Sequence, residues 1–289
     1  MPIYIIGGQN MGAKIISFIN MKGGVGKTTL CLGIGEYISQ EDTYNKRILY
    51  IDMDPQFNTT QTLMNEFNLE EKYLSEYYKT KNVRKIFEMP ATITEKPDLP
   101  NPEEIIVKLN SNIDIIPGTI NLIIEDSNKE DKIRRLKKFI KDKKLRENYD
   151  FIFIDCPPTI SLYTDAALMT SDYYLVPNRI DRYSILGIKL LKQVIDRLKN
   201  NQDLEIKALG IVYTMVGEET NKTIRLKNIF EDSEIVKEIG LFSGETRYVR
   251  DLLVGLQGNI ASKYKTSRED IQIICKEFLE RIESYEEHS

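Results

Sequence analysis

Short apolar runs recur along the chain and alternate with segments whose apolar residues keep helical spacing. The apolar runs lie at residues 15–19, 47–52, 112–116, 151–155, 173–177 and 209–215. Runs of this length that end in turn or acidic residues are typical of buried parallel strands. Helices are predicted at residues 62–80, 83–88, 131–147, 184–198 and 267–285. Strands that alternate with helices in this way predict an α/β fold.

The predicted domain organisation follows from the length of the chain and from one polar stretch. A chain of 289 residues, 41% of them hydrophobic, can bury one sizeable core, so residues 14–289 are predicted to form a single domain. Residues 1–13 are an N-terminal extension, in which residues 3–6 could add an edge strand. Residues 61–111 are polar and are interpreted as a variable, solvated insertion, with contacts to a partner as the alternative.

Charge and cysteine content bear on the class of protein. The 40 basic and 44 acidic residues give a net charge of −4, so binding to a nucleic acid would need a local basic patch. Cys31, Cys156 and Cys275 form no C-x-x-C pair and are interpreted as small buried hydrophobic residues rather than disulfide partners or zinc ligands. No apolar run approaches the length of a membrane span, and no signal peptide is recognisable. We therefore expect a cytoplasmic protein.

Candidate chemistry is concentrated in a glycine-rich segment between the first predicted strand and the helix after it. Gly23, Gly24 and Gly26 allow backbone N–H groups to turn toward an anion. The start of a helix near Thr28 adds its positive dipole end and its unpaired N–H groups. The segment therefore predicts a nucleotide-binding phosphate loop, whose candidate residues are Lys22, Gly23, Gly24, Val25, Gly26, Lys27, Thr28 and Thr29.

The loop departs from the common form of this motif because Met21 stands where a glycine belongs and a second lysine, Lys22, follows it. This Lys-Gly-Gly-x-Gly-Lys-Thr-Thr form resembles the deviant Walker A motif of the ParA/MinD family of P-loop ATPases. The resemblance implies that Lys27 contacts the phosphates of ATP, that Thr28 ligates Mg²⁺, and that Lys22 crosses a dimer interface to the partner subunit's ATP. It also implies a doubly wound, mostly parallel sheet flanked by helices on both faces.

Two acidic elements extend this resemblance. The strand at 47–52 leads into Asp-Met-Asp-Pro-Gln, which looks like an element of the family, although Asp-Pro is also common in ordinary turns. The strand at 151–155 leads into Asp-Cys-Pro-Pro, which resembles the family's Walker B strand. Carried over to this chain, Asp52 and Asp155 organise the Mg²⁺ shell, and Asp54 orients or deprotonates the attacking water. The catalytic candidates are therefore Lys22, Lys27 and Asp54.

Later segments supply candidates for the adenine base and for DNA. The family reads the base near the end of the last predicted strand, which makes Thr214 and Met215 base-pocket candidates. Arg247 and Arg250 lie in a segment that loosely resembles one that binds DNA phosphates in ParA-like proteins, and surface ion pairs are the alternative. The basic helix at 131–147 is a second candidate for DNA, with an ordinary solvated face as the alternative.

The resemblance implies an ATPase that acts in plasmid or chromosome partition. Two copies of the chain would enclose ATP and Mg²⁺, and the dimer would bind nonspecific DNA on the nucleoid. Slow hydrolysis, stimulated by a ParB-like centromere-binding partner, would release the DNA. A ParA-like ATPase that positions a protein complex would carry the same motifs and is an open alternative. A MinD-like membrane-associated ATPase would need a basic amphipathic tail, whereas this tail is acidic.

Overall fold

The computed structural model describes residues 12–89, 98–123, 132–202, 204–255 and 258–288. Within these ranges seven strands form one sheet in the order β3-β4-β2-β5-β1-β6-β7. All neighbouring strands are parallel except β3 and β4. The strands are β1 (Lys14–Phe18), β2 (Ile48–Asp52), β3 (Val107–Lys108), β4 (Ile113–Ile116), β5 (Phe151–Asp155), β6 (Tyr173–Asn178) and β7 (Lys207–Tyr213).

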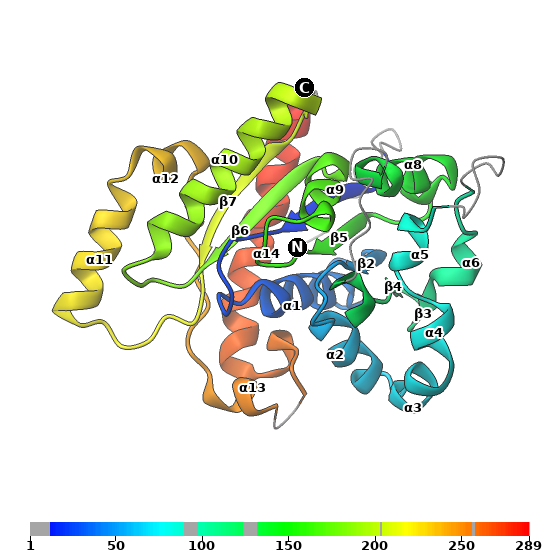
Figure 1. The fold of residues 1–289 in the computed structure, drawn as a ribbon. Helices are drawn as coiled ribbons and strands as arrows, with labels where there is room; N and C mark the ends of the chain where they lie inside the picture. Colours follow the sequence, from blue (N-terminus) through cyan, green and yellow to red (C-terminus); the bar gives the residue numbers. More distant parts are fainter. Residues whose placement is uncertain (1–11, 90–97, 124–131, 203, 256–257, 289) are drawn as a thin grey trace.

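Helices cover both faces of this sheet (Figure 1). In the described ranges none of them is both long and apolar enough to cross a membrane. The helices are α1 (Lys27–Ser39), α2 (Asn58–Glu66), α3 (Glu70–Lys72), α4 (Tyr78–Thr80), α5 (Arg84–Phe87), α6 (Pro102–Ile105), α8 (Arg135–Asp142), α9 (Leu162–Thr170), α10 (Ser184–Gln202), α11 (Asn221–Glu231), α12 (Glu234–Ile239), α13 (Arg250–Val254) and α14 (Lys265–Glu287). A π-helical turn spans Tyr73–Tyr77, and 3₁₀ turns span Ile120–Ile123, Leu145–Glu147 and Ala261–Lys263.

The first strand shows why both faces of the sheet need cover. Ile15 and Ile19 pack in a core with α8, α9 and α10, whereas Ile16 and Phe18 pack in a second core with α1 and α14. Successive side chains of a strand point to opposite faces, so a strand covered on both sides must be apolar at nearly every position. The continuous apolar runs in the sequence have this cause. The predicted doubly wound, mostly parallel sheet is therefore confirmed.

Strand register brings the predicted motifs to one edge of the sheet. Asp155 at the end of β5 is paired with Asp52 at the end of β2 and with Phe18 at the end of β1. Parallel strands end at the same edge, so the loop after β1 and both carboxylates lie together at the carboxyl edge. This is the edge at which ligands bind in folds of this type.

The C-terminal helix α14 packs beside α1 against one face of the sheet. Ile271 lies so close to Gly33 that a side chain at that glycine would come within 2.9 Å of its Cδ1 atom. Cys275 lies beside the backbone carbonyl of Ile34, at 3.8 Å. Arg281 donates to the backbone carbonyl of Leu209 in β7, at 2.5 Å. α14 is therefore part of the main core.

The polar insertion is more regular than the sequence predicts. Residues 62–80 are not one helix, because Asn68 takes a left-handed φ of 55° between α2 and α3. The stretch after Pro100, in which the sequence predicts neither a helix nor a strand, contains α6 and the strand β3. β3 pairs only two residues with β4, which is too short for a recognisable sequence period.

The basic segment predicted as a helix at 131–147 is also shorter than expected. Its regular part, α8, ends at Asp142, and Lys144 takes a left-handed φ of 52° before a 3₁₀ turn. Residue 131 and the predicted edge strand at residues 3–6 lie outside the described residues.

All three cysteines are buried and free. Burial raises the pKa of the Cys31, Cys156 and Cys275 thiols above its ordinary value. Their interpretation as small buried hydrophobic residues is confirmed.

Candidate nucleotide site

The loop between β1 and α1 is shaped by backbone geometry. Gly24 and Gly26 have φ angles of 69° and 79°, in the left-handed region that favours glycine. A side chain at Gly24 would meet no atom within 4 Å, so the need for glycine there is conformational. α1 begins directly after Gly26 and has no side-chain cap at its N-terminus. The N–H groups of its first turn are therefore available to an anion in the loop.

Lys27 is a buried cation beside this turn. The residue is 6% exposed, and its Nζ donates to the backbone carbonyl of Lys22 at 3.2 Å. Burial lowers the pKa of Lys27, and the carboxylates of Asp155 and Asp54 act in the opposite direction. A buried ammonium group without a bonded carboxylate is poorly solvated. An anion in the loop would therefore gain a strong partner.

Asp155 connects the loop with α2. Its Oδ2 atom accepts hydrogen bonds from the Thr28 hydroxyl at 2.6 Å and from the Thr59 hydroxyl at 2.8 Å. Its Oδ1 atom is buried and has no partner in the described part of the chain. Burial raises the pKa of Asp155, while the two threonine hydroxyls lower it. A buried carboxylate oxygen needs a donor, and a metal-bound water supplies one. Thr28 and Asp155 therefore fit the predicted Mg²⁺ site.

Asp52 holds the start of α2. Its Oδ2 atom accepts from the backbone N–H and the hydroxyl of Thr60, at 2.8 and 2.7 Å, and its Oδ1 accepts from the backbone N–H of Asp54 at 3.2 Å. Burial and the neighbouring Asp155 raise the pKa of Asp52. Both oxygens are bonded to the protein, so neither is left open toward a metal as Oδ1 of Asp155 is.

Asp54 lies in a tight turn before α2. Its Oδ1 accepts from the backbone N–H of Gln56 at 2.9 Å, and its backbone carbonyl accepts from Phe57, which has a left-handed φ of 41°. Burial raises the pKa of Asp54, whereas the hydrogen bond from Gln56 and the charge of Lys27 lower it. This turn holds the carboxylate beside Lys27, where it could orient a water.

Lys22 forms an ion pair within its own chain. Its Nζ contacts Oδ2 of Asp181, in the loop between β6 and α10. The Oδ1 atom of Asp181 accepts from the backbone N–H of Tyr183 at 2.8 Å, at the start of α10. α10 lies close to the loop, because a side chain at Gly187 would come within 2.8 Å of the Asn20 amide oxygen. Lys22 must therefore leave Asp181 if it is to reach a nucleotide in another copy of the chain.

The predicted base-pocket residues lie next to the phosphate loop. The Thr214 hydroxyl donates to the backbone carbonyl of Val25 at 2.7 Å. Met215 has a left-handed φ of 53°. A Cβ atom added at Gly26 would lie 3.2 Å from the Cε atom of Met215. The end of β7 is thereby attached to the loop.

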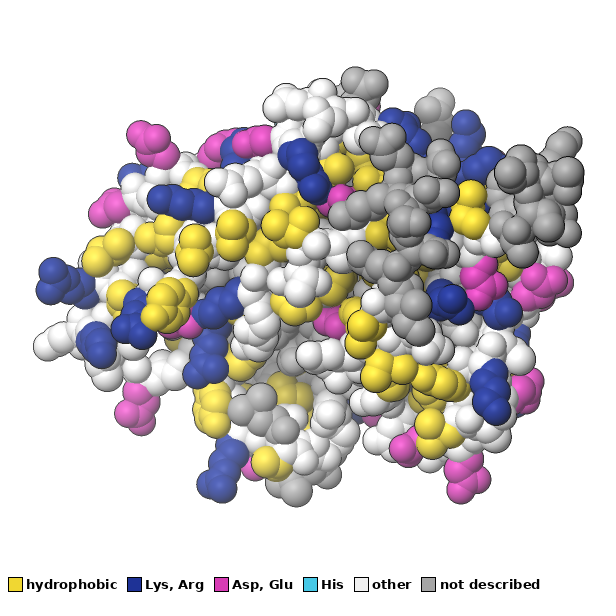
Figure 2. All heavy atoms as spheres, viewed as in Figure 1, with side chains coloured by type: hydrophobic (Ala, Val, Ile, Leu, Met, Phe, Trp, Pro, Cys, Tyr) yellow, Lys and Arg dark blue, Asp and Glu magenta, His cyan; other side chains and the backbone are white. Residues whose placement is uncertain are grey.

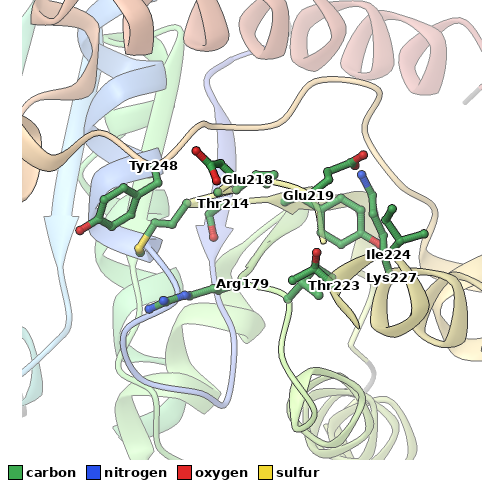
Figure 3. Close-up of a pocket in the computed structure, with 13 residues that line it drawn as sticks. Arg179, Thr214, Glu218, Glu219, Thr223, Ile224, Lys227 and Tyr248 are labelled. Carbon is green, nitrogen blue, oxygen red and sulfur yellow. The ribbon is translucent and has the colours of Figure 1, made fainter. Parts of the chain in front are cut away.

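Thr214 and Met215 also line a cavity of about 340 Å³ beyond the end of β7. Figure 3 shows Arg179 and Tyr248 at one end of this cavity, and Thr223 and Lys227 of α11 at the other. Its volume is within the range of small-molecule sites.

The two arginines predicted to contact DNA have different surroundings. Arg247 donates through Nε to Asp270 at 2.8 Å and through Nη2 to Glu269 at 3.1 Å. This guanidinium attaches its segment to α14. The surroundings of Arg247 therefore match the alternative of a surface ion pair. Arg250, at the start of α13, is exposed and forms no ion pair with the described residues.

Several basic residues of the predicted helix at 131–147 are also engaged. Arg135 is buried and donates to backbone carbonyls, and Arg146 is paired with Asp172. Lys137 and Lys141 are exposed, and neither forms an ion pair in the part of the chain that the structure describes.

Asn20, Thr59 and Asp181 contact the site but are not among the predicted residues. Asn20 donates to the backbone carbonyl of Pro177 at 2.9 Å and accepts from Lys22 at 3.1 Å. Thr59 lies three residues after the Asp-Met-Asp-Pro-Gln element, so its position in the sequence was a usable signal. Asn20 and Asp181 carry no such signal, because their contacts depend on β1, β6 and α10 meeting in space.

Comparison with known proteins gives one consistent result. The sequence matches the AAA domain family AAA_31 over residues 13–207. It is 29% identical over 230 residues to the sporulation initiation inhibitor protein Soj of Bacillus subtilis, covering 76% of this chain and 81% of that protein. It is 30% identical over 214 residues to the chromosome partitioning protein ParA of Myxococcus xanthus, covering 72% of this chain and 67% of that protein.

Among solved structures, a plasmid partition protein of Borrelia burgdorferi bound to AMPPNP has a TM-score of 0.71 at 22% identity, with coverage of 93% of this chain and 99% of that chain. This likeness concerns the fold. The sequence matches show that the chain belongs to the AAA_31 family of AAA domains and to the ParA/Soj-type partition ATPases.

Proposed function

We propose that this chain hydrolyses ATP to segregate a plasmid or a chromosome. Two copies enclose ATP and Mg²⁺, and the dimer binds nonspecific DNA on the nucleoid. Hydrolysis is slow until a ParB-like centromere-binding partner stimulates it, and it then releases the DNA. Family membership supports the role in partition. The observation that carries the chemistry is the buried Lys27 beside an uncapped helix N-terminus and a carboxylate, Asp155, one oxygen of which has no partner among the described residues.

The residues of the site divide the work of phosphoryl transfer. Lys27 and the loop N–H groups hold the phosphates, while Thr28 and Asp155 hold Mg²⁺, which when bound neutralises charge on the phosphates. Asp54 orients the attacking water. Phosphoryl transfer depends mainly on position and charge neutralisation, so a carboxylate held in a tight turn is sufficient for this role. Lys22 leaves Asp181 and contacts the nucleotide of the partner.

The DNA-binding surface lies around Arg250 and the cavity beyond β7, with Arg247 holding its segment in place. Arg179, Lys222, Arg225 and Arg250 are exposed, and none forms an ion pair within the described residues. Each of them lines the cavity or stands within two residues of one that does. Figure 2 shows Lys and Arg side chains over α11 and between α11 and α13. In a chain of net charge −4, such a local patch is what phosphate binding requires.

The test compares DNA binding with ATP, with ADP and without nucleotide. Binding should require ATP, should not depend on DNA sequence and should weaken as salt is added, because phosphate contacts release counterions. Lys27→Ala should lose ATP binding and, with it, DNA binding. Normal Mg-ATP affinity in this variant would remove the loop from the proposed site.

The location of the DNA surface is tested with two sets of variants. Replacing Arg179, Lys222, Arg225 and Arg250 with alanine should lower the slope of log affinity against log salt by about 0.9 for each lost contact. ATP turnover without DNA should stay near that of the wild type. The matched control replaces Lys137 and Lys141 of α8 with alanine. A loss of DNA affinity in the control alone would move the surface to α8.

A further inference from the structure

One hydrogen bond ties α2 to the proposed metal site. Thr59 is completely buried in the first turn of α2, and its hydroxyl donates to Oδ2 of Asp155 at 2.8 Å. The same oxygen accepts from Thr28, the proposed Mg²⁺ ligand, at 2.6 Å. The other oxygen of Asp155 has no partner among the described residues. Asp155 is therefore held on one side by two hydroxyls and left open on the other.

We propose that Thr59 is a positioning residue for the ATPase reaction, acting through Asp155 on the metal. A carboxylate that accepts two hydrogen bonds on one oxygen cannot rotate without stretching both of them. Thr59 therefore keeps Oδ1 of Asp155 free for a water bound to Mg²⁺. Partners that orient a metal-binding group in this way strongly affect metal affinity. This inference rests on the proposed ATPase function.

The same hydrogen bond connects the metal to the proposed water-positioning residue. Asp54 precedes Thr59 in one continuous turn, in which Gln56 and Phe57 both donate to Asp54. The end of that turn is fixed at Asp155 by Thr59. The metal site and the turn that carries Asp54 are therefore joined by this one hydrogen bond.

A purely structural role for Thr59 is the competing explanation. The start of α2 already has another attachment, because Thr60 donates to Asp52 and its hydroxyl accepts from the backbone N–H of Gly118 at 2.8 Å. α2 therefore does not need Thr59 in order to be held in place. The two roles differ in what they predict for metal binding.

The test replaces the hydroxyl by a methyl group of similar size, in Thr59→Val. The control is Thr62→Val on the same helix, because Thr62 is half-buried and has no hydrogen bond to the described residues. Binding of Mn²⁺ in the presence of AMPPNP is followed by electron paramagnetic resonance. Thr59→Val should bind Mn²⁺ roughly tenfold more weakly, while AMPPNP binding without metal stays unchanged. Thr62→Val and Thr59→Ser should bind as the wild type does.

Turnover adds a second measurement. Thr59→Val should lower kcat at saturating Mg²⁺ without a matching rise in the KM for ATP, because Asp155 loses one of the two hydrogen bonds that orient it toward the metal. Equal Mn²⁺ affinity in Thr59→Val and the wild type would overturn the inference. So would a Thr59→Ser variant as weak as Thr59→Val, since the hydroxyl would then not be the cause. Absence of Mn²⁺ binding by the wild type would overturn the ATPase function together with the inference.

Discussion

Replacing Asp181 with asparagine should make the ATP-dependent dimer form more readily. Asparagine keeps an oxygen for the hydrogen bond from Tyr183 that starts α10, but it loses the charge that holds Lys22. The lysine is then released from its own chain. Since we propose that it contacts the partner's nucleotide, the free energy of dimer formation should become more favourable.

The exposure of the ion pair sets the size of this effect. The side chains of Lys22 and Asp181 are 25% and 40% exposed, so the pair is partly solvated. Such pairs contribute about 0.2–1 kcal/mol each. One pair is broken in each of the two copies, so the dimerisation constant should rise by a factor between about 2 and 30. For a fully buried ion pair, the expected change in the dimerisation constant would be much larger.

Sedimentation velocity with a non-hydrolysable ATP analogue measures this constant directly. Asp196→Asn is the matched control, because Asp196 is paired with Lys192 on the same helix with side chains 46% and 30% exposed. The control should dimerise as the wild type does, and Lys22→Ala should stay monomeric. A folded Asp181→Asn variant that dimerises no better than the wild type would show that the ion pair does not restrain Lys22.

Three further results are expected. Asp54→Ala should bind ATP and remain on DNA while phosphate release falls by about a hundredfold; normal release would assign the water to another residue. Gly35→Ala should lower the free energy of unfolding by about 1–3 kcal/mol, because its side chain would come within 2.1 Å of the buried Tyr50 hydroxyl; an unchanged urea midpoint would contradict this packing. The metal-free protein should gain stability as pH falls below neutral toward the ordinary carboxyl range, because burial raises the pKa of both Asp52 and Asp155. In that range the folded chain holds protons that the unfolded chain releases. A Tm that rises with pH would therefore refute the raised pKa of these carboxyl groups. Addition of Mg²⁺ with AMPPNP should make the Tm depend less on pH.

The parts of the site that were predicted from sequence are those in which chemistry follows a strand directly. The apolar runs before Gly23, Asp52 and Asp155 locate the strand ends, and parallel strands necessarily end at a common edge. The relative position of the loop and the acids therefore follows from the order of the elements. This position can be predicted without any information about distant side chains.

The parts that were not predicted depend on contacts between distant segments. Arg247 and Arg250 look alike in sequence, but Arg247 is paired with Asp270 and Glu269 on α14, whereas Arg250 forms no ion pair with the described residues. The contact of Lys22 with Asp181 joins residues 159 positions apart. Local pattern cannot predict such pairs, because they exist only once the sheet order is set.

The packing of α14 on α1 has a consequence for biosynthesis. α1 ends at residue 39, whereas α14 begins at residue 265. A ribosome adding about 5–20 residues per second needs on the order of tens of seconds to make the intervening chain. Throughout that time the apolar side of α1 and of the central strands lacks its cover. A nascent chain of this kind exposes an apolar surface of the type that chaperones recognise.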